Sequence, residues 1–457
     1  MTSTSSSPVR IVAARYVLPV IGEPIEHGAV AVEGDTIVAV GTLVDLAAQY
    51  AGAEVSDYGL AAMTPGFIDN HTHLEYTAMR GLIEDAPYSR WKYEVMRREL
   101  LLTPEDWEDS ALLGAIEAAL SGITTVADIT KSGSSGRAAQ RIGLRSVIYR
   151  EVGTMDRNAV DATMAAASSD IERWRAEWDS SRTTVGIAPH SAYSCHPHLF
   201  RKVAEYAADG TPVAMHLAGS QEEYQFVKYG SSMLGHEVRE QYNAEAPLWL
   251  PTGVSPVRYV QQWEIFHAPN VMAVHCTQVD DDDIEILATY DIAVAHCPRC
   301  NSKLAMGIMP LKKMLDAGIR VGLGTDSPAA SNSMDTFEEM RIGLLVQRAA
   351  LGRDHFFTAA QFLKMATYES ARALRMEDTI GSLEVGKRAD LIVVDLSGSA
   401  QAPTQDPASA IVHTAHQNNV SMTMVGGEVI YERGTFSHVD LAPLTARAQE
   451  LRDKLRA

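Results

Sequence analysis

The feature that most constrains the fold is a series of eight short apolar runs in the middle of this 457-residue chain. The runs are rich in Val, Ile and Ala and alternate with amphipathic helical stretches, as parallel strands do when helices cover both faces of their sheet. In chain order they read GFIDNHTH, ITTVADI, RSVIYREV, TVGIAPH, PVAMHLA, VMAVHCT, IAVAHCP and RVGLGTD. Eight such units predict an α/β protein built on a (β/α)8 barrel of the TIM type.

Two flanking regions have a different sequence pattern. Residues 9–63 and 380–437 contain short alternating runs separated by glycine-rich turns, and each region alone is too small to bury a sheet. We therefore expect them to pair as a small β-sandwich built from both termini. The expected boundaries are 1–64 and 378–440 for the sandwich, 65–377 for the catalytic barrel, and 441–457 for a C-terminal helix.

Charge and cysteine content exclude several classes of function. The formal net charge is −19 with no basic stripe, so neither nucleic acid nor an anionic membrane is an expected partner. Four cysteines in a chain of this length do not form a disulfide scaffold, and no second CxxC accompanies Cys297 and Cys300 to complete a thiolate zinc site. We see no signal peptide or membrane segment and expect a cytoplasmic location.

Metal-competent side chains stand at the C-terminal ends of the predicted strands. In a barrel these ends meet at one opening, and residues two apart on a strand point to the same face. Three imidazoles and a carboxylate at that opening would supply the nitrogen and oxygen ligands that zinc, iron, manganese or cobalt accept. The strand-end residues are His71, His73, His190, His216, His275, His296 and Asp326.

Taken together, several motifs resemble the amidohydrolase superfamily. They are PGFIDNHTHLEYTAMRG, GITTVADI, APHSAYSC, MHLAGSQEE, VHCTQV, HCPRCNSKLAMGIMP, LGTDSPAASNSMDTFEEMR and GSLEVGKRADLIVVD, and they cover nearly the whole chain. The branch they resemble contains triazine hydrolases, adenosine-type and guanine-type deaminases, and phenylurea and thiocarbamate hydrolases. The resemblance implies that a small molecule is the substrate and that the protein is a homo-oligomer.

The resemblance also assigns roles to the strand-end residues. It implies that His71, His73, His216 and Asp326 hold one divalent metal, most naturally Zn²⁺, with Fe²⁺, Co²⁺ and Mn²⁺ as alternatives. His275 would lie beside the water, where it polarises the electrophile, and Asp326 would act as general base. A metal in such a site lowers the pKa of bound water to roughly 7.

One position departs from the family pattern. Aromatic-ring deaminases of this family carry HxxE at the fifth strand, and the glutamate protonates a ring nitrogen, whereas this chain has His216-Leu-Ala-Gly219. A missing proton donor favours an ordinary carbonyl electrophile, so the first hypothesis is hydrolysis of a C–N bond in a urea, carbamate or thiocarbamate, N-aryl ureas included.

Two other functions stay open. The first is a heteroaromatic deaminase or dechlorinase for purines, pterins or triazines, in which Glu222 or Glu223 replaces the missing carboxylate. The second is a binding protein on a barrel scaffold that has lost catalysis through Gly219.

The resemblance also implies that His190 lies near the substrate. From their positions in the sequence, we expect Trp91, Arg150, Gly219 and Glu222 to contact substrate and His296 to orient a metal ligand. The long connection from Gly219 to His267 is rich in aromatic residues. It forms either a lid over an apolar substrate or its own small core, which could also face a neighbouring subunit.

Overall fold

The computed structural model describes residues 8–234 and 250–456. Each of the eight predicted runs forms one strand of a single parallel sheet, in which every strand lies beside its predecessor in the sequence. The predicted (β/α)8 architecture is confirmed. The strands are β6 (Phe67–Thr72), β7 (Ile123–Thr130), β8 (Arg145–Val152), β9 (Thr183–Pro189), β10 (Val213–Leu217), β11 (Val271–His275), β12 (Ala293–His296) and β13 (Val321–Leu323).

The barrel is nearly closed, and its first and last strands approach each other at their C-terminal ends. The backbone N–H of Asp326 donates to the carbonyl of His71 at 2.9 Å, and the hydroxyl of Thr72 donates to the carbonyl of Asp326 at 3.1 Å. Two residues before His71 on the same strand, the buried Asp69 accepts a hydrogen bond of 2.6 Å from the hydroxyl of Thr325. We call this junction between β6 and the residues after β13 the seam.

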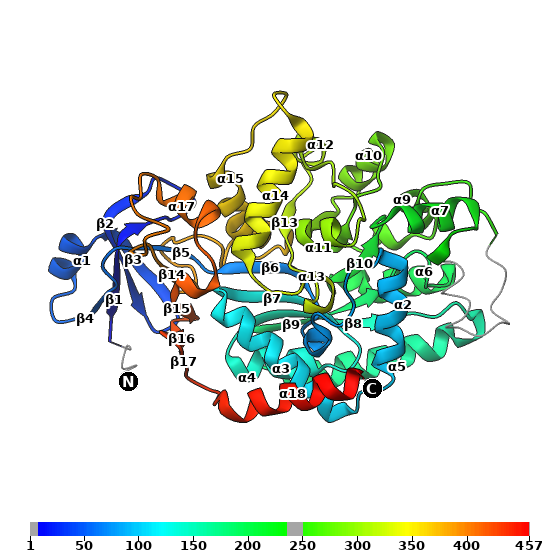
Figure 1. The fold of residues 1–457 in the computed structure, drawn as a ribbon, viewed down its shortest axis with the longest axis horizontal. Helices are drawn as coiled ribbons and strands as arrows, with labels where there is room; N and C mark the ends of the chain where they lie inside the picture. The colour runs from blue at the N-terminus through cyan, green and yellow to red at the C-terminus, as the bar shows by residue number, and fades with distance from the viewer. Residues whose placement is uncertain (1–7, 235–249, 457) are drawn as a thin grey trace.

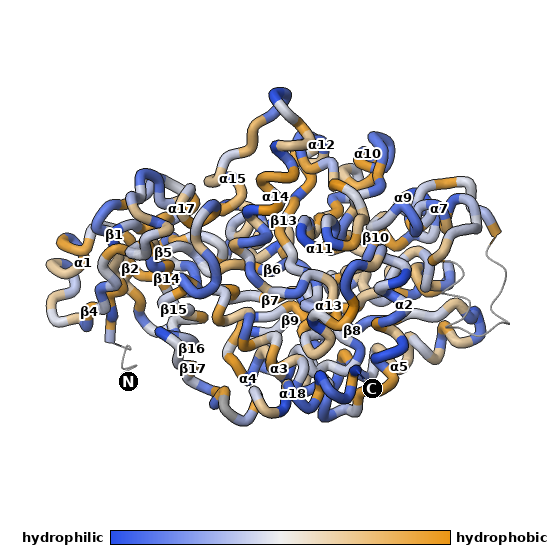
Figure 2. Tube along the Cα trace, in the orientation of Figure 1, coloured by the Kyte–Doolittle hydropathy of each residue, from blue (hydrophilic) through white to orange (hydrophobic). Residues whose placement is uncertain are grey.

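Helices surround the barrel because each has one apolar face that the strands bury. The helix α3 begins at Thr103, whose hydroxyl forms a capping box with the Asp106 carboxylate. Figure 2 shows hydrophilic residues on outward-facing helices such as α10, which starts with three consecutive aspartates. The surrounding helices are α3 (Pro104–Leu120), α4 (Ser134–Ile142), α5 (Val160–Glu177), α6 (Pro197–Tyr206), α10 (Asp281–Thr289), α11 (Pro298–Lys303), α12 (Leu311–Asp316), α14 (Thr336–Leu351), α15 (Ala359–Lys364) and α16 (Ser370–Ala373).

A second, mixed sheet of nine strands is built from both ends of the chain, as predicted. Figure 1 shows its N-terminal and C-terminal strands side by side at one end of the molecule, where the two groups meet between β5 and β14. At its centre, β5 lies between β1, which is parallel to it, and β14, which is antiparallel. The strands are β1 (Arg10–Val17), β2 (Ile25–Glu33), β3 (Thr36–Thr42), β4 (Glu54–Asp57), β5 (Ala61–Pro65), β14 (Leu391–Asp395), β15 (Val420–Val425), β16 (Glu428–Glu432) and β17 (Thr435–Phe436); α1 (Leu43–Gln49) and α17 (Pro407–His413) complete this region.

A buried ion pair fastens the barrel to the mixed sheet. Arg145, at the start of β8, reaches Asp390, just before β14, with Nε–Oδ2 and Nη2–Oδ1 distances of 2.8 and 3.2 Å. The two side chains are only 7% and 2% exposed. Asp390 also accepts a hydrogen bond from the backbone N–H of Gly426 at 2.6 Å, so its carboxylate is fully engaged.

Replacing Arg145 with methionine is expected to lower the free energy of unfolding by about 3 kcal/mol, because it leaves the Asp390 carboxylate buried without its counter-ion. Urea denaturation of the purified protein measures this change. In the double variant Arg145→Met, Asp390→Leu the charge is gone altogether, and we expect part of the stability to return. A double variant no more stable than the single one would contradict the explanation.

The long connection after β10 contains the helices α7 (Gln221–Tyr229) and α9 (Pro256–Gln262). Its aromatic residues pack in two different places. Phe226 packs with Tyr193 and Leu234 beside the catalytic face, whereas Tyr259 packs on the buried Phe200 of α6. Tyr242 and Trp249, which belong to the same aromatic stretch, lie outside the described residues.

The C-terminal helix α18 (Ala442–Arg456) lies along α3, as the red ribbon in Figure 1 shows. Arg447 pairs with Asp109 at 2.6 Å and also contacts Asp106, while the buried Leu455 joins the apolar cluster beneath α2 (Tyr88–Glu99). The four cysteines are free. None of the helices in residues 8–234 and 250–456 is long and apolar enough to cross a membrane.

Candidate metal centre

The predicted strand-end residues come together at the C-terminal opening of the barrel. The Nε2 atoms of His73 and His216 are 3.3 Å apart. Nε2 of His71 lies 3.7 Å from Oδ1 of Asp326, and Nε2 of His275 lies 3.9 Å from Oδ2 of the same carboxylate. The ring of His71 packs edge-on against those of both His73 and His216, with centroids 4.8 and 5.0 Å away.

The hydrogen bonds of these rings leave their Nε2 lone pairs facing one another. The Nδ1 of His73 donates to the carbonyl of Ile129 at 2.8 Å, and the Nδ1 of His216 donates to the carbonyl of His190 at 2.9 Å. Each neutral imidazole therefore carries its proton on Nδ1 and has only an acceptor at Nε2. Two acceptors at 3.3 Å repel each other, and a cation between them removes the conflict.

His71 also has a ring nitrogen whose lone pair lacks a partner. Its ring is 1% exposed, and Nε2 has no hydrogen-bond partner among the described residues. A buried nitrogen without a partner costs free energy unless a ligand uses its lone pair. The donor atoms of His71, His73 and Asp326 all lie within 4.8 Å of one another, and so do those of His71, His216 and His275. This donor set fits one divalent cation.

The electrostatics favour neutral imidazoles around an ionised carboxylate. Burial lowers the pKa of His71 well below its ordinary value and that of His216 to about 3. For Asp326, burial acts to raise the pKa, but the neighbouring His275 and His73 outweigh it, and the pKa is lowered. Neutral histidine and ionised aspartate are the forms that bind metal.

The backbone is strained where it presents these groups. Ala218, His275, Cys276 and Asp326 have φ values of +48°, +76°, +46° and +56°, which side-chain-bearing residues adopt at a cost. Hydrogen bonds hold the strained residues in place. Asp326 Oδ1 accepts from the N–H of Ser327 at 2.6 Å, and His275 Nδ1 donates to the side-chain oxygen of Asn301 at 3.0 Å.

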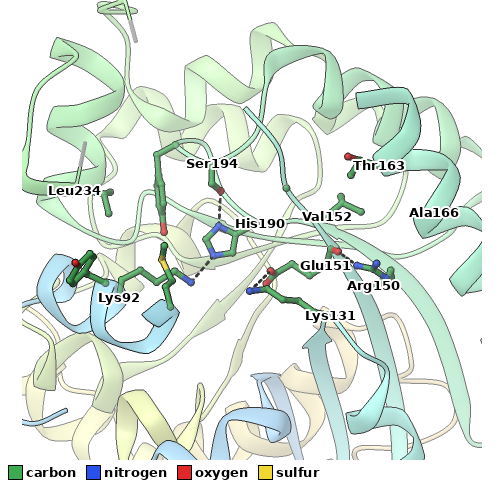
Figure 3. A pocket seen from close by; sticks show the side chains of 14 residues that line it. Lys92, Lys131, Arg150, Glu151, Val152, Thr163, Ala166, His190, Ser194 and Leu234 are labelled. Atoms are coloured by element: carbon green, nitrogen blue, oxygen red, sulfur yellow. Dashed lines mark hydrogen bonds and ion pairs between the residues drawn. The ribbon is translucent and has the colours of Figure 1, made fainter. Parts of the chain in front are cut away.

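The helix α2 roofs this centre. The indole N–H of Trp91 donates to the carbonyl of Ala329 at 3.0 Å, which ties α2 to the far side of the opening. Beneath the roof is an inner chamber of about 30 Å³, whose lining includes His73, His216, His275, Asp326, Trp91 and Lys92. It adjoins an outer cavity of about 480 Å³ (Figure 3). Of the residues expected to contact substrate, His190 and Trp91 line the inner chamber.

Arg150 and Glu222, which the sequence also assigns to substrate contact, have hydrogen-bond partners within the protein. Arg150 reaches the wall of the outer cavity, but its Nε binds Asp170 at 2.9 Å. Both carboxylate oxygens of Glu222 accept hydrogen bonds from Ser89, from its N–H and its hydroxyl, each 3.0 Å long. Glu222 therefore caps α2 from 133 residues away. Both side chains serve structural contacts in this arrangement.

His296 lies at the end of β12, and both of its ring nitrogens are buried without a hydrogen-bond partner among the described residues. It therefore forms no hydrogen bond to His71, His73 or His216, and the last two of these are oriented by backbone carbonyls instead. The sulfur of Cys300 is nearer to the centre, within 4.8 Å of ligand atoms of both His275 and Asp326.

The carboxylate of Glu223 lies beside Gly219, the position where the family's glutamate is missing. Its Oε2 accepts a hydrogen bond of 2.8 Å from the N–H of Gly219, while its Oε1 is buried and has no partner among the described residues. Burial raises the pKa of Glu223 to about 7. A Cβ on Gly219 would lie 3.1 Å from both His275 Cδ2 and Met306 Cε, so this glycine faces the centre closely.

A parallel (β/α)8 barrel with histidines and an aspartate gathered at its C-terminal opening defines a metal-dependent hydrolase. The chain belongs to the amidohydrolase family, whose model matches residues 62–430. A shorter match, at residues 28–53, is to the imidazolonepropionase-like composite domain of bacteria.

Similar curated proteins are deaminases. The 5-methylthioadenosine/S-adenosylhomocysteine deaminase of Pelotomaculum thermopropionicum is 33% identical over 430 residues, with 93% of each chain covered. The protein of the same name from Desulforudis audaxviator is also 33% identical, covering 96% of this chain and 97% of its own. These relatives support the heteroaromatic deaminase hypothesis better than the phenylurea or thiocarbamate hypothesis, which neither of them supports.

Solved structures agree in fold. An adenosine deaminase from Xanthomonas campestris with bound zinc has a TM-score of 0.85 and 27% identity, covering 98% of both chains. An atrazine chlorohydrolase from Arthrobacter aurescens complexed with zinc has a TM-score of 0.83, covers 97% of this chain and 99% of its own, and at 23% identity shows the shared fold alone.

Proposed function

We propose that this protein is a metal-dependent deaminase that hydrolyses the exocyclic amine of a purine or a related heteroaromatic ring. Its relatives with that activity support the proposal over nearly the whole chain. The observation that carries it is the buried carboxylate of Glu223, which stands beside Gly219, where the family's ring-protonating glutamate is missing.

The ligand set would be His71, His73, His216 and Asp326, and the ion Zn²⁺ or a similar divalent metal. These residues offer three neutral imidazole nitrogens and one carboxylate, a set that zinc accepts. When bound, such a metal lowers the pKa of a bound water to about 7 and so makes a nucleophile available at neutral pH.

Asp326 would take a proton from the attacking water and pass it to the departing amine, which leaves as ammonia. Its Oδ2 faces His275 at 3.9 Å while its Oδ1 is held by Ser327, so the carboxylate is fixed between the histidines. His275 carries its proton on Nδ1, where Asn301 accepts it, which leaves Nε2 free to steady the water.

Glu223 would protonate a ring nitrogen as the water attacks. Attack on an aminated ring carbon places negative charge on the adjacent ring nitrogen, which a carboxylic acid can neutralise. A carboxyl group whose pKa is about 7 is half protonated at neutral pH and can therefore donate a proton and recover it from solvent. The unpartnered Oε1 is the atom available for this transfer within the described structure.

A panel of candidate substrates tests the proposal. With metal-loaded protein, we expect ammonia release from 5′-methylthioadenosine, S-adenosylhomocysteine or adenosine at least about 100-fold faster than aniline release from an N-aryl urea. Ammonia and aniline are measured directly, and a chelator control should abolish whichever activity appears. Cleavage of ureas or thiocarbamates with inert aminopurines would overturn the proposal.

That contrary result would favour the second candidate, hydrolysis of a neutral carbonyl compound. The observation behind this candidate is Gly219 itself, which leaves no side chain between the backbone and His275. A carbonyl electrophile needs no ring protonation, so Glu223 would then serve only to cap α7.

A further inference from the structure

The outer cavity contains one cation that forms no direct ion pair with a carboxylate of the described residues. Three basic side chains line this cavity, and they are Lys92, Lys131 and Arg150 (Figure 3). Two of them are paired. Lys131 Nζ lies 2.7 Å from Glu99 and 3.7 Å from Glu151, and Arg150 is bound to Asp170.

Lys92 has a different environment. Its Nζ donates to Nε2 of His190 at 3.1 Å, and no carboxylate in residues 8–234 and 250–456 lies within ion-pair distance of it. The side chain is half-buried and extends from α2 to the boundary between the inner chamber and the outer cavity, both of which it lines.

An ammonium group can only donate, so Nε2 of His190 accepts the hydrogen bond from Lys92. In that tautomer the proton of His190 is on Nδ1, which donates to the hydroxyl of Ser194 at 2.6 Å. An ammonium group has three N–H donors. His190 uses one of them, and two are left to face the cavity.

We propose that Lys92 determines specificity by binding a carboxylate group of the substrate in the outer cavity. The inference rests on the proposed function for the reacting half of the molecule, whose aminated ring would face the metal centre. A lysine ammonium is a compact positive charge with rotatable N–H donors, which can bind the oxygens of a carboxylate. Glu151 lines the same cavity, so a dianionic phosphate would be repelled more strongly than a singly charged group.

This assignment differs from the sequence-based expectation for Arg150. A guanidinium at that strand end is a natural candidate for contacting substrate, but Asp170 already holds it. We therefore assign anion binding to Lys92, which lies on α2 and also lines the inner chamber at the metal centre.

A matched pair of substrates tests the proposal. S-adenosylhomocysteine and 5′-methylthioadenosine share the adenine, ribose and thioether, and only the first carries a carboxylate. In Lys92→Met we expect kcat/KM for S-adenosylhomocysteine to fall about 10- to 100-fold, mainly through KM, and that for 5′-methylthioadenosine to change less than about threefold. Equal losses on both substrates would overturn the proposal.

Two further variants serve as controls. Lys92→Arg keeps the positive charge and is expected to keep the preference for the carboxylate. Arg90→Met removes a cation from the exposed side of the same helix, where Arg90 pairs with Glu94, and is expected to leave both kinetic constants unchanged. Circular dichroism checks folding, and Lys92→Gln replaces the methionine variant if that variant does not fold.

A binding measurement separates this inference from the proposed function. If neither adenine compound reacts, the deaminase proposal fails, but calorimetry with benzoate and the neutral benzamide still tests Lys92. We expect wild-type protein loaded with metal to bind benzoate about tenfold more tightly than Lys92→Met does, with benzamide unaffected. Equal affinities in the two proteins, or tighter binding of phenyl phosphate than of benzoate, would overturn the assignment.

Discussion

Replacing Asp326 with asparagine is expected to lower kcat/KM by about 10⁴-fold or more. The substitution preserves the shape of the side chain but removes a metal ligand and the base that accepts the proton of the water. Without the metal, the pKa of that water returns to a value far above neutral, so almost none of it is deprotonated at neutral pH.

Metal content and kinetics together decide this prediction. Elemental analysis should show that Asp326→Asn holds well under one equivalent of metal after dialysis, while unfolding remains cooperative. The control is Asp282→Asn, an exposed aspartate at the start of α10, for which both metal content and rate should match the wild type. A fully active Asp326→Asn protein would contradict the ligand assignment.

Replacing Glu223 with glutamine is expected to lower kcat for aminopurine deamination by about 10²- to 10⁴-fold, because an amide cannot deliver the proton to the ring. Metal content should stay at the wild-type value, which distinguishes this variant from Asp326→Asn. The control is Glu177→Gln at the exposed end of α5. If Glu223→Gln retains more than about a third of the wild-type kcat, the carboxylate only caps α7.

The same residue gives a pH dependence with a definite sign. Burial raises the pKa of Glu223 to about 7, so the protonated form that can donate prevails below that pH and is lost above it. The wild-type kcat should therefore decline as pH rises through about 7. This decline should be absent from the residual activity of Glu223→Gln.

The barrel is predictable from sequence because its signal is local and repeated. Each strand is a short run of β-branched and small apolar residues, and each following helix has its own end signals, as Thr103 shows for α3. The strand-end histidines are equally visible, since the carboxyl ends of parallel strands must share one side of the barrel. The order of strands alone therefore places His71, His73, His216 and Asp326 at the same opening.

The roof of the centre is not predictable in this way. The contacts that position α2 join residues far apart in sequence, with Trp91 bound 238 positions away to Ala329 and Ser89 bound 133 positions away to Glu222. The hydrophobic periodicity of the sequence does not indicate contacts between residues so far apart. For the same reason, sequence alone does not show that the side chain of Lys92 faces His190.

The sequence contains a signal that indicates where the side chain of Glu223 lies. Ser220-Gln-Glu-Glu223 fits the S-x-x-E pattern of a capping box, in which the glutamate turns back toward the start of its helix. In the structure the Ser220 hydroxyl accepts from the N–H of Glu223, and the carboxylate returns to Gly219. The motif thus brings a carboxylate back to a position whose own residue has none.

The seam gives metal occupancy a second consequence. The proposed ligands include His71 from the first strand and Asp326 after the last, and around them Thr72 and Asp326 are joined across 254 positions of sequence. A cation held there clasps the two ends of the barrel, so its binding free energy adds to that of folding. In a cell starved of that ion, both the turnover of each molecule and the number of molecules that escape proteolysis would fall.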